Sequence, residues 1–81
     1  MDFERGQVVF SKAGRDCGYP MLVLKEEDGF VFVVDGKERP LSRPKRKNPK
    51  HLAPTKKIVD QSDMANDSRI KKVLKQFIVE D

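Results

Sequence analysis

The chain has 81 residues, which allows one small domain with a marginal core. Its apolar runs, Met21–Leu24 and Phe30–Val34, are far shorter than the ~20 residues of a membrane-spanning helix. The N-terminus shows no apolar stretch of the kind found in a signal peptide. A single cysteine, Cys17, cannot form a disulfide within the chain and fits a reducing compartment. We therefore expect a soluble, cytoplasmic protein without a membrane partner.

Positive charge is concentrated in residues 37–57, here called the basic segment. This segment carries nine Lys or Arg and one acid, Glu38, whereas residues 1–36 carry a net charge of −3 and residues 58–81 a net charge of −1. A basic stripe on an acidic body is typical of a protein that binds a polyanion. Two other interpretations stay open, a solvated loop that only aids solubility and a nuclear import signal in the Pro-Lys-Arg-Lys run.

The first half of the chain has the residue types of β-strands, separated by turn signals. Gly14 and Gly18 bound a loop, and Asp28-Gly29 and Asp35-Gly36 are typical of tight turns. The prolines of the basic segment exclude helix and disfavour a central strand. We therefore predict strands at Gln7–Ser11, Tyr19–Lys25 and Phe30–Asp35, with further short strands around Arg39–Leu41 and His51–Pro54.

The pattern changes after residue 60. Ile70, Val73, Leu74 and Phe77 follow the spacing of one helix face, which predicts an amphipathic helix at about residues 67–78. The strand Phe30–Val34 is apolar on both faces and therefore needs cover on both. We expect a small barrel to bury one face and the helix to bury the other.

The motifs from Gly6 to Thr55 resemble a KOW domain. The opening Gly-Gln-Val-Val-Phe-Ser-Lys-Ala-Gly-Arg-Asp-Cys-Gly (6–18), the Val-Val-Asp-Gly turn (33–36) and the closing Lys-His-Leu-Ala-Pro-Thr (50–55) carry this resemblance. The branch concerned holds a large-subunit ribosomal protein of archaea and eukaryotes and short bacterial KOW-domain RNA-binding proteins. The resemblance implies an SH3-like barrel that binds RNA. Cys17 and Tyr19 stand where similar proteins often carry a base, which weakens the expected phosphate contact there.

We therefore expect a mainly β fold, a small SH3-like barrel with one C-terminal amphipathic α-helix. Residues 1–59 would form the KOW-type domain, including the basic segment. Residues 60–81 would form a linker and the helix packed on the barrel.

The candidate RNA contacts are cations of the basic segment and of the preceding loop. Lys and Arg bind phosphates and release the counterions condensed on them. The candidates are Lys12, Arg15, Lys37, Arg39, Arg43, Lys45, Arg46, Lys47 and Lys50.

Two further side chains are candidates, each with a structural alternative. Tyr19 is the only tyrosine and could stack on an unpaired base or pack half-buried at the start of a strand. His51 could contact phosphate or pack at a barrel edge. We expect structural turn roles for Gly14, Gly18, Gly29 and Gly36, and core positions for the five Phe.

No enzyme, metal or cofactor is expected from this sequence. One Cys and one His cannot supply a zinc site, and the loop glycines lack the Gly-Lys-Ser/Thr of a P-loop. No carboxylate pair stands in an acid/base motif, and so small a chain leaves little room for a substrate pocket.

The basic segment predicts binding to a polyanion, and the resemblance to KOW domains implies that this is structured, ribosomal RNA and that the protein acts with the ribosome in translation; no small-molecule substrate is expected. Two alternatives remain, a KOW module in transcription that binds protein through an apolar barrel edge and one that binds duplex DNA. Charge alone does not separate RNA from DNA.

Overall fold

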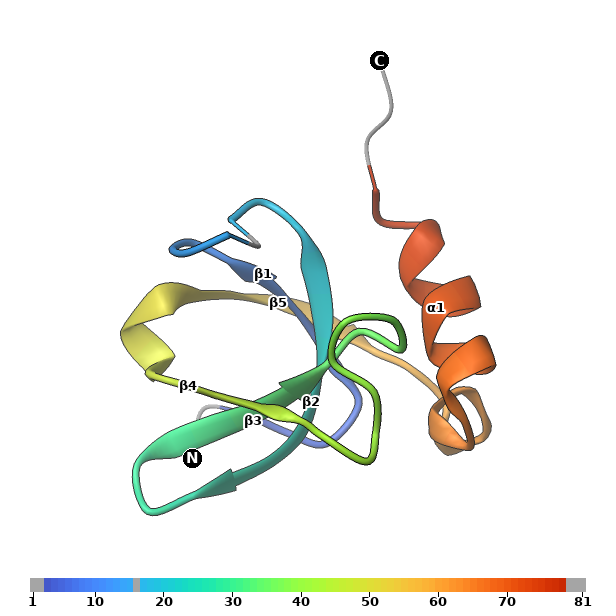
Figure 1. Ribbon diagram of the computed structural model, residues 1–81, viewed down its shortest axis with the longest axis horizontal. Coiled ribbons are helices and arrows are strands. Elements are labelled where there is room, and N and C mark those ends of the chain that lie inside the picture. The colour runs from blue at the N-terminus through green and yellow to red at the C-terminus, as the bar shows by residue number, and fades with distance from the viewer. Residues whose placement is uncertain (1–2, 16, 79–81) are drawn as a thin grey trace.

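The computed structural model describes residues 3–15 and 17–78, which form a five-stranded antiparallel sheet and one C-terminal α-helix (Figure 1). This confirms the mainly β prediction and the C-terminal helix. The strands are β1 (Gln7–Ser11), β2 (Pro20–Glu27), β3 (Phe30–Val34), β4 (Lys45–Lys47) and β5 (Leu52–Ile58). Two short 3-10 helices, η1 (Pro49–His51) and η2 (Gln61–Met64), precede β5 and α1 (Asp67–Lys75) respectively.

The strands lie in the order β4-β3-β2-β1-β5, so β4 and β5 are the sheet edges. The Asp28-Gly29 turn joins β2 to β3 as predicted, with φ of 52° and 80° at its two residues. Both values are positive, as a two-residue type I′ turn requires. The sheet curls around one of its faces (Figure 1), but the ladders between described residues do not join β4 to β5 into a closed barrel.

The concave face of the sheet holds one of two apolar clusters. Alternate residues of β2 and β3 point into it, as the period of two in a strand requires. Its buried members are Val9, Met21, Val23, Val31, Val33 and Leu52, and Phe3 packs half-buried against them.

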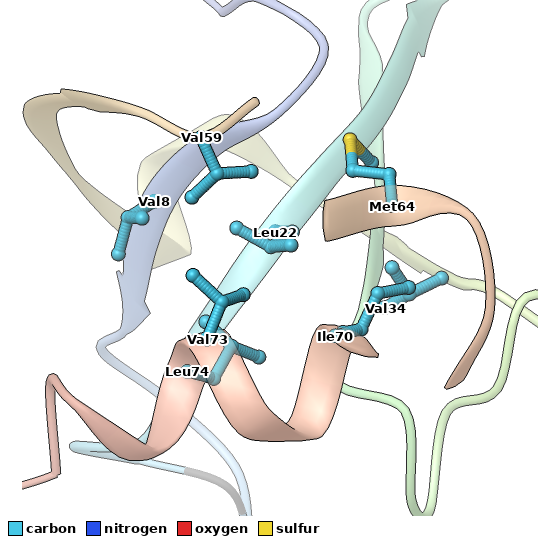
Figure 2. Packing of buried hydrophobic residues seen from close by; sticks show 8 residues of the cluster. All are labelled: Val8, Leu22, Val34, Val59, Met64, Ile70, Val73 and Leu74. Carbon is cyan, nitrogen blue, oxygen red and sulfur yellow. The ribbon is translucent and has the colours of Figure 1, made fainter. Parts of the chain in front are cut away.

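The second cluster lies between the opposite face of the sheet and α1 (Figure 2). Its members from α1 are Ile70, Val73 and Leu74, three of the four residues that set the predicted helical stripe. They pack against Val8, Leu22, Val34, Val59 and Met64, and η2 contributes the methionine.

The helix was expected to bury one whole face of β3, but it buries only the C-terminal end of that face. Val34 is fully buried beneath α1, whereas Phe32 and Phe30, two and four residues earlier on the same face, are half-buried. All five Phe of the chain are half-buried, and Phe3, Phe10 and Phe77 pack against the two apolar clusters, so these three lie at the margin of the core rather than inside it. Most of the fully buried side chains are valines, whose compact branched side chains fit both pleated faces of the sheet.

The start of α1 is fixed by its own cap and by contacts with the chain between β3 and β4. Asn66 caps the helix by accepting from the Arg69 backbone N–H at 2.9 Å. Asp67 Oδ1 accepts from the Leu41 backbone N–H at 2.8 Å. Gly36 lies so close that a Cβ there would overlap the carbonyl oxygen of Asp67. The helix therefore begins against the turn that follows β3.

Several predicted bounds are corrected. Arg39–Leu41 forms a turn rather than a strand, and the strand of this region, β4, was not predicted. The strand expected at His51–Pro54 begins at Leu52 and extends to Ile58. The helix ends at Lys75, three residues before its predicted end.

Candidate nucleic-acid interface

The basic segment is held by backbone and side-chain hydrogen bonds along its length. Asp35 Oδ1 accepts from the backbone N–H groups of Lys37 and Arg39, each at 2.8 Å, and so shapes the turn at its start. β4 then pairs with β3, and β5 pairs with β1. Between them, the side chain of Asn48 caps η1 by accepting from the Lys50 backbone N–H at 3.0 Å. The backbone that carries its cations is therefore fixed.

Lys47 points into the protein, unlike the other candidate cations of the basic segment. It is 6% exposed, and its Nζ donates to Ser11 Oγ at 2.6 Å and to the Ala13 carbonyl at 3.1 Å. These bonds tie the edge strand β4 to the end of β1 and the loop after it. The Lys47 ammonium is thus committed to internal acceptors.

Arg46, its neighbour on β4, lies on the opposite face and is exposed. Its guanidinium lies 4.6 Å from the centre of the Phe30 ring, a cation–π contact. Lys25 of β2 lies in the same way 4.9 Å from the Phe32 ring. Lys25, Phe32 and Arg46 are direct partners in the ladders, so they form one row across three strands. Phe30 thereby orients the Arg46 side chain.

The loop between β1 and β2 meets η1 at one end of the sheet. The Lys12 backbone N–H donates to the His51 carbonyl at 2.7 Å. This bond brings together three candidate residues from two parts of the sequence, all exposed: Lys12, Lys50 and His51.

A groove of about 560 Å³ lies between the β1–β2 loop, the β3–β4 turn and α1. Arg15 and Tyr19 line it from the first loop, and Lys37 lines it from the turn. Lys71 of α1 lines it as well, with Leu74 and Ile78. Three residues predicted separately therefore share one concave surface.

The remaining candidates lie along the basic segment. Arg43 is exposed, and Arg39 and Lys45 are half-buried. Gly14 and Gly18 both have positive φ, at 85° and 90°, in the loop that carries Arg15.

Sequence reasoning missed Lys71 and the two phenylalanines on one face of β3, each with a cation over its ring. Lys71 belongs to the polar face of a helix, and no sequence pattern tells which polar residues of such a face border a groove. Phe30 and Phe32 did carry a signal, because residues two apart in a strand share a face.

The comparison with models of known protein families finds no match to this chain. Within the part of the chain that the structure describes, no helix is long and apolar enough to cross a membrane. The same residues contain no group of three or more His, Cys, Asp or Glu arranged to hold a metal ion.

Proposed function

We propose that the protein binds structured RNA, with ribosomal RNA as the target class, and acts by binding rather than by catalysis. The observation that carries the proposal is that exposed cations project from a hydrogen-bonded backbone. These cations come from the basic segment and the β1–β2 loop, and include Lys12, Arg43, Arg46 and Lys50. A fixed array can match the phosphate spacing of a folded RNA, which is recognised largely by shape.

The resemblance to KOW domains supports this proposal and suggests an SH3-like barrel. A curled antiparallel sheet of five short strands with an apolar concave face fits such a barrel. We place the protein with the ribosome in the cytoplasm, consistent with its single cysteine.

The protein would bind by electrostatic attraction between its cations and the RNA phosphates, helped by an Arg46 side chain that is already ordered. Each cation that neutralises a phosphate releases a counterion, so affinity falls with salt. Arg46 is held over Phe30 before binding, which lowers the side-chain entropy lost when it meets a phosphate. Its planar guanidinium can donate two parallel hydrogen bonds to one phosphate.

The test is the salt dependence of binding to a structured ribosomal RNA fragment. We expect the double variant Arg46→Ala/Lys50→Ala to lower the slope of log affinity against log salt by about two. The matched control, Lys72→Ala/Lys75→Ala, removes the same charge from the exposed face of α1 and should leave the slope unchanged. Equal effects from both variants would contradict a defined surface.

A DNA duplex of equal length, measured at the same salt, separates RNA from DNA. The proposal requires tighter binding to the RNA, because the A-form groove and the 2′-hydroxyls differ from B-form DNA. Equal or tighter binding to DNA would instead support the DNA-binding alternative.

A further inference from the structure

The groove between the β1–β2 loop and α1 combines an exposed aromatic ring with apolar surface. Tyr19 is 57% exposed, and Ile78, across the groove on the chain after α1, is 40% exposed. The buried residues Pro20 and Leu74 also line it. A volume of about 560 Å³ lies within the range of small-molecule sites. One flat group the size of a nucleobase fits such a space.

The backbone around Tyr19 is held at both sides of the residue. The Ser11 backbone N–H donates to the Tyr19 carbonyl at 3.1 Å, and the Gly18 N–H donates to the Ser11 carbonyl at 2.7 Å. Pro20, the next residue, is buried at the start of β2. The tyrosine is therefore presented from a fixed strand end.

Three cations border the same groove. Arg15, Lys37 and Lys71 come from three separate parts of the chain and are all exposed. Two acids, Asp35 and Glu38, also line it. Asp35 is half-buried and its Oδ1 accepts from two backbone N–H groups, whereas Glu38 is exposed. The three cations outnumber the two acids, so the groove carries a net positive charge and suits an anion attached to a flat apolar group.

We propose that this groove binds one unpaired nucleotide extruded from the bound RNA. Its base stacks on the Tyr19 ring beside Ile78, and its phosphates are held by Arg15, Lys37 and Lys71. This inference rests on the proposed RNA binding and adds to it a preference for RNA with a bulged or unpaired nucleotide. Stacking on an aromatic side chain is how unpaired bases are commonly bound.

The decisive experiment compares two RNA stems that differ by one bulged nucleotide. The unmodified protein should bind the bulged stem about 5- to 150-fold more tightly than the fully paired stem, which corresponds to the ~1–3 kcal/mol of one stacked base. Tyr19→Leu should abolish this preference, and Tyr19→Phe should keep it, because Phe retains the ring. Since Tyr19 is exposed, both variants should keep the thermal midpoint of the original protein.

The outcomes distinguish the groove from the proposed function. Equal affinity of the unmodified protein for the two stems, or a preference kept by Tyr19→Leu, overturns the groove inference and leaves RNA binding intact. Failure to bind either stem overturns both.

A second pair of variants tests the phosphate contacts. Lys71→Ala should lower the salt slope for the bulged stem by about one, and Lys72→Ala, its neighbour outside the groove, should leave the slope unchanged. Equal slopes for the two variants would count against a phosphate at Lys71.

Direct observation is possible because the chain has one tyrosine and no tryptophan. The ring-proton NMR signals of tyrosine therefore report Tyr19 alone. They should shift upfield when the bulged stem is added and stay in place with the paired stem. Identical shifts with both stems would contradict stacking by the extruded base.

Discussion

At the scale of single residues, the adjacent cations Arg46 and Lys47 of β4 differ in burial and in role. Lys47 is buried and hydrogen-bonded to the end of β1 and the loop after it, while Arg46 is exposed over Phe30. The alternation of a strand explains the difference, since successive side chains point to opposite faces. A run of like charges in the sequence therefore contains both a structural and a candidate binding residue.

Lys47→Met should destabilise the protein by about 1–3 kcal/mol, because it removes the buried charge-assisted hydrogen bonds from Lys47 Nζ to Ser11 Oγ and to the Ala13 carbonyl while keeping most of the aliphatic stem. Urea unfolding measures the loss. Lys50→Met, at an exposed site, should change the free energy of unfolding by less than about 0.5 kcal/mol. Equal losses from the two variants would contradict an internal role for Lys47.

The contact between Arg46 and Phe30 is tested by a double-mutant cycle with Arg46→Met and Phe30→Leu. We expect a coupling free energy of about 0.5–1 kcal/mol, as found for exposed cation–π pairs. Phe30→Leu should also weaken RNA binding although it removes no charge, because Arg46 is then less ordered. Additive stability effects would show that the ring does not hold the guanidinium.

At the scale of elements, α1 depends on its contact with the turn after β3. Gly36 has φ of 78° and faces the first turn of the helix, whereas Gly29 has φ of 80° and no atom within 4 Å of a Cβ placed there. Both glycines have a positive φ, but only Gly36 has backbone atoms of α1 beside it. They form a matched pair for measuring the contact.

Gly29→Ala should cost about 1–2 kcal/mol, the penalty of left-handed backbone for an L-residue. Gly36→Ala should cost more, because its Cβ also overlaps the backbone of α1 and the helix must shift. Thermal or urea unfolding of both variants gives the comparison. If Gly36→Ala lowered the free energy of unfolding by no more than Gly29→Ala does, α1 would be able to move away from the new Cβ without loss of stability.

At the scale of the whole molecule, local patterns predicted the elements better than their assembly. Local patterns predicted α1 from the apolar stripe of Ile70, Val73 and Leu74, and the β2–β3 turn from Asp28-Gly29. Both predictions succeeded because each of these elements depends on residues close together in the sequence. β4 was missed because Lys-Arg-Lys has low strand propensity, and only pairing with β3 makes it a strand. The groove was missed because it joins three segments that are distant in the sequence.

The two apolar clusters lie on opposite faces of one sheet, which predicts that they unfold together. Leu22 points toward α1, while Met21 and Val23 on either side point into the concave cluster. Loss of α1 would expose Val8, Leu22 and Val34 to water, and the strands that carry them also form the other cluster. We therefore expect loss of either cluster to destabilise the other.

Thermal unfolding should accordingly be a single transition with the same midpoint by two probes, the helical circular dichroism of α1 and the amide NMR signals of Val9 and Val33, whose side chains belong to the concave cluster on the face away from α1. Ile70→Ala in one cluster and Val31→Ala in the other should each lower that common midpoint, because each removes fully buried methyl groups. If Ile70→Ala lowered the midpoint of the helical signal and left that of the Val9 and Val33 amides in place, α1 would unfold independently and the sheet would be stable without it.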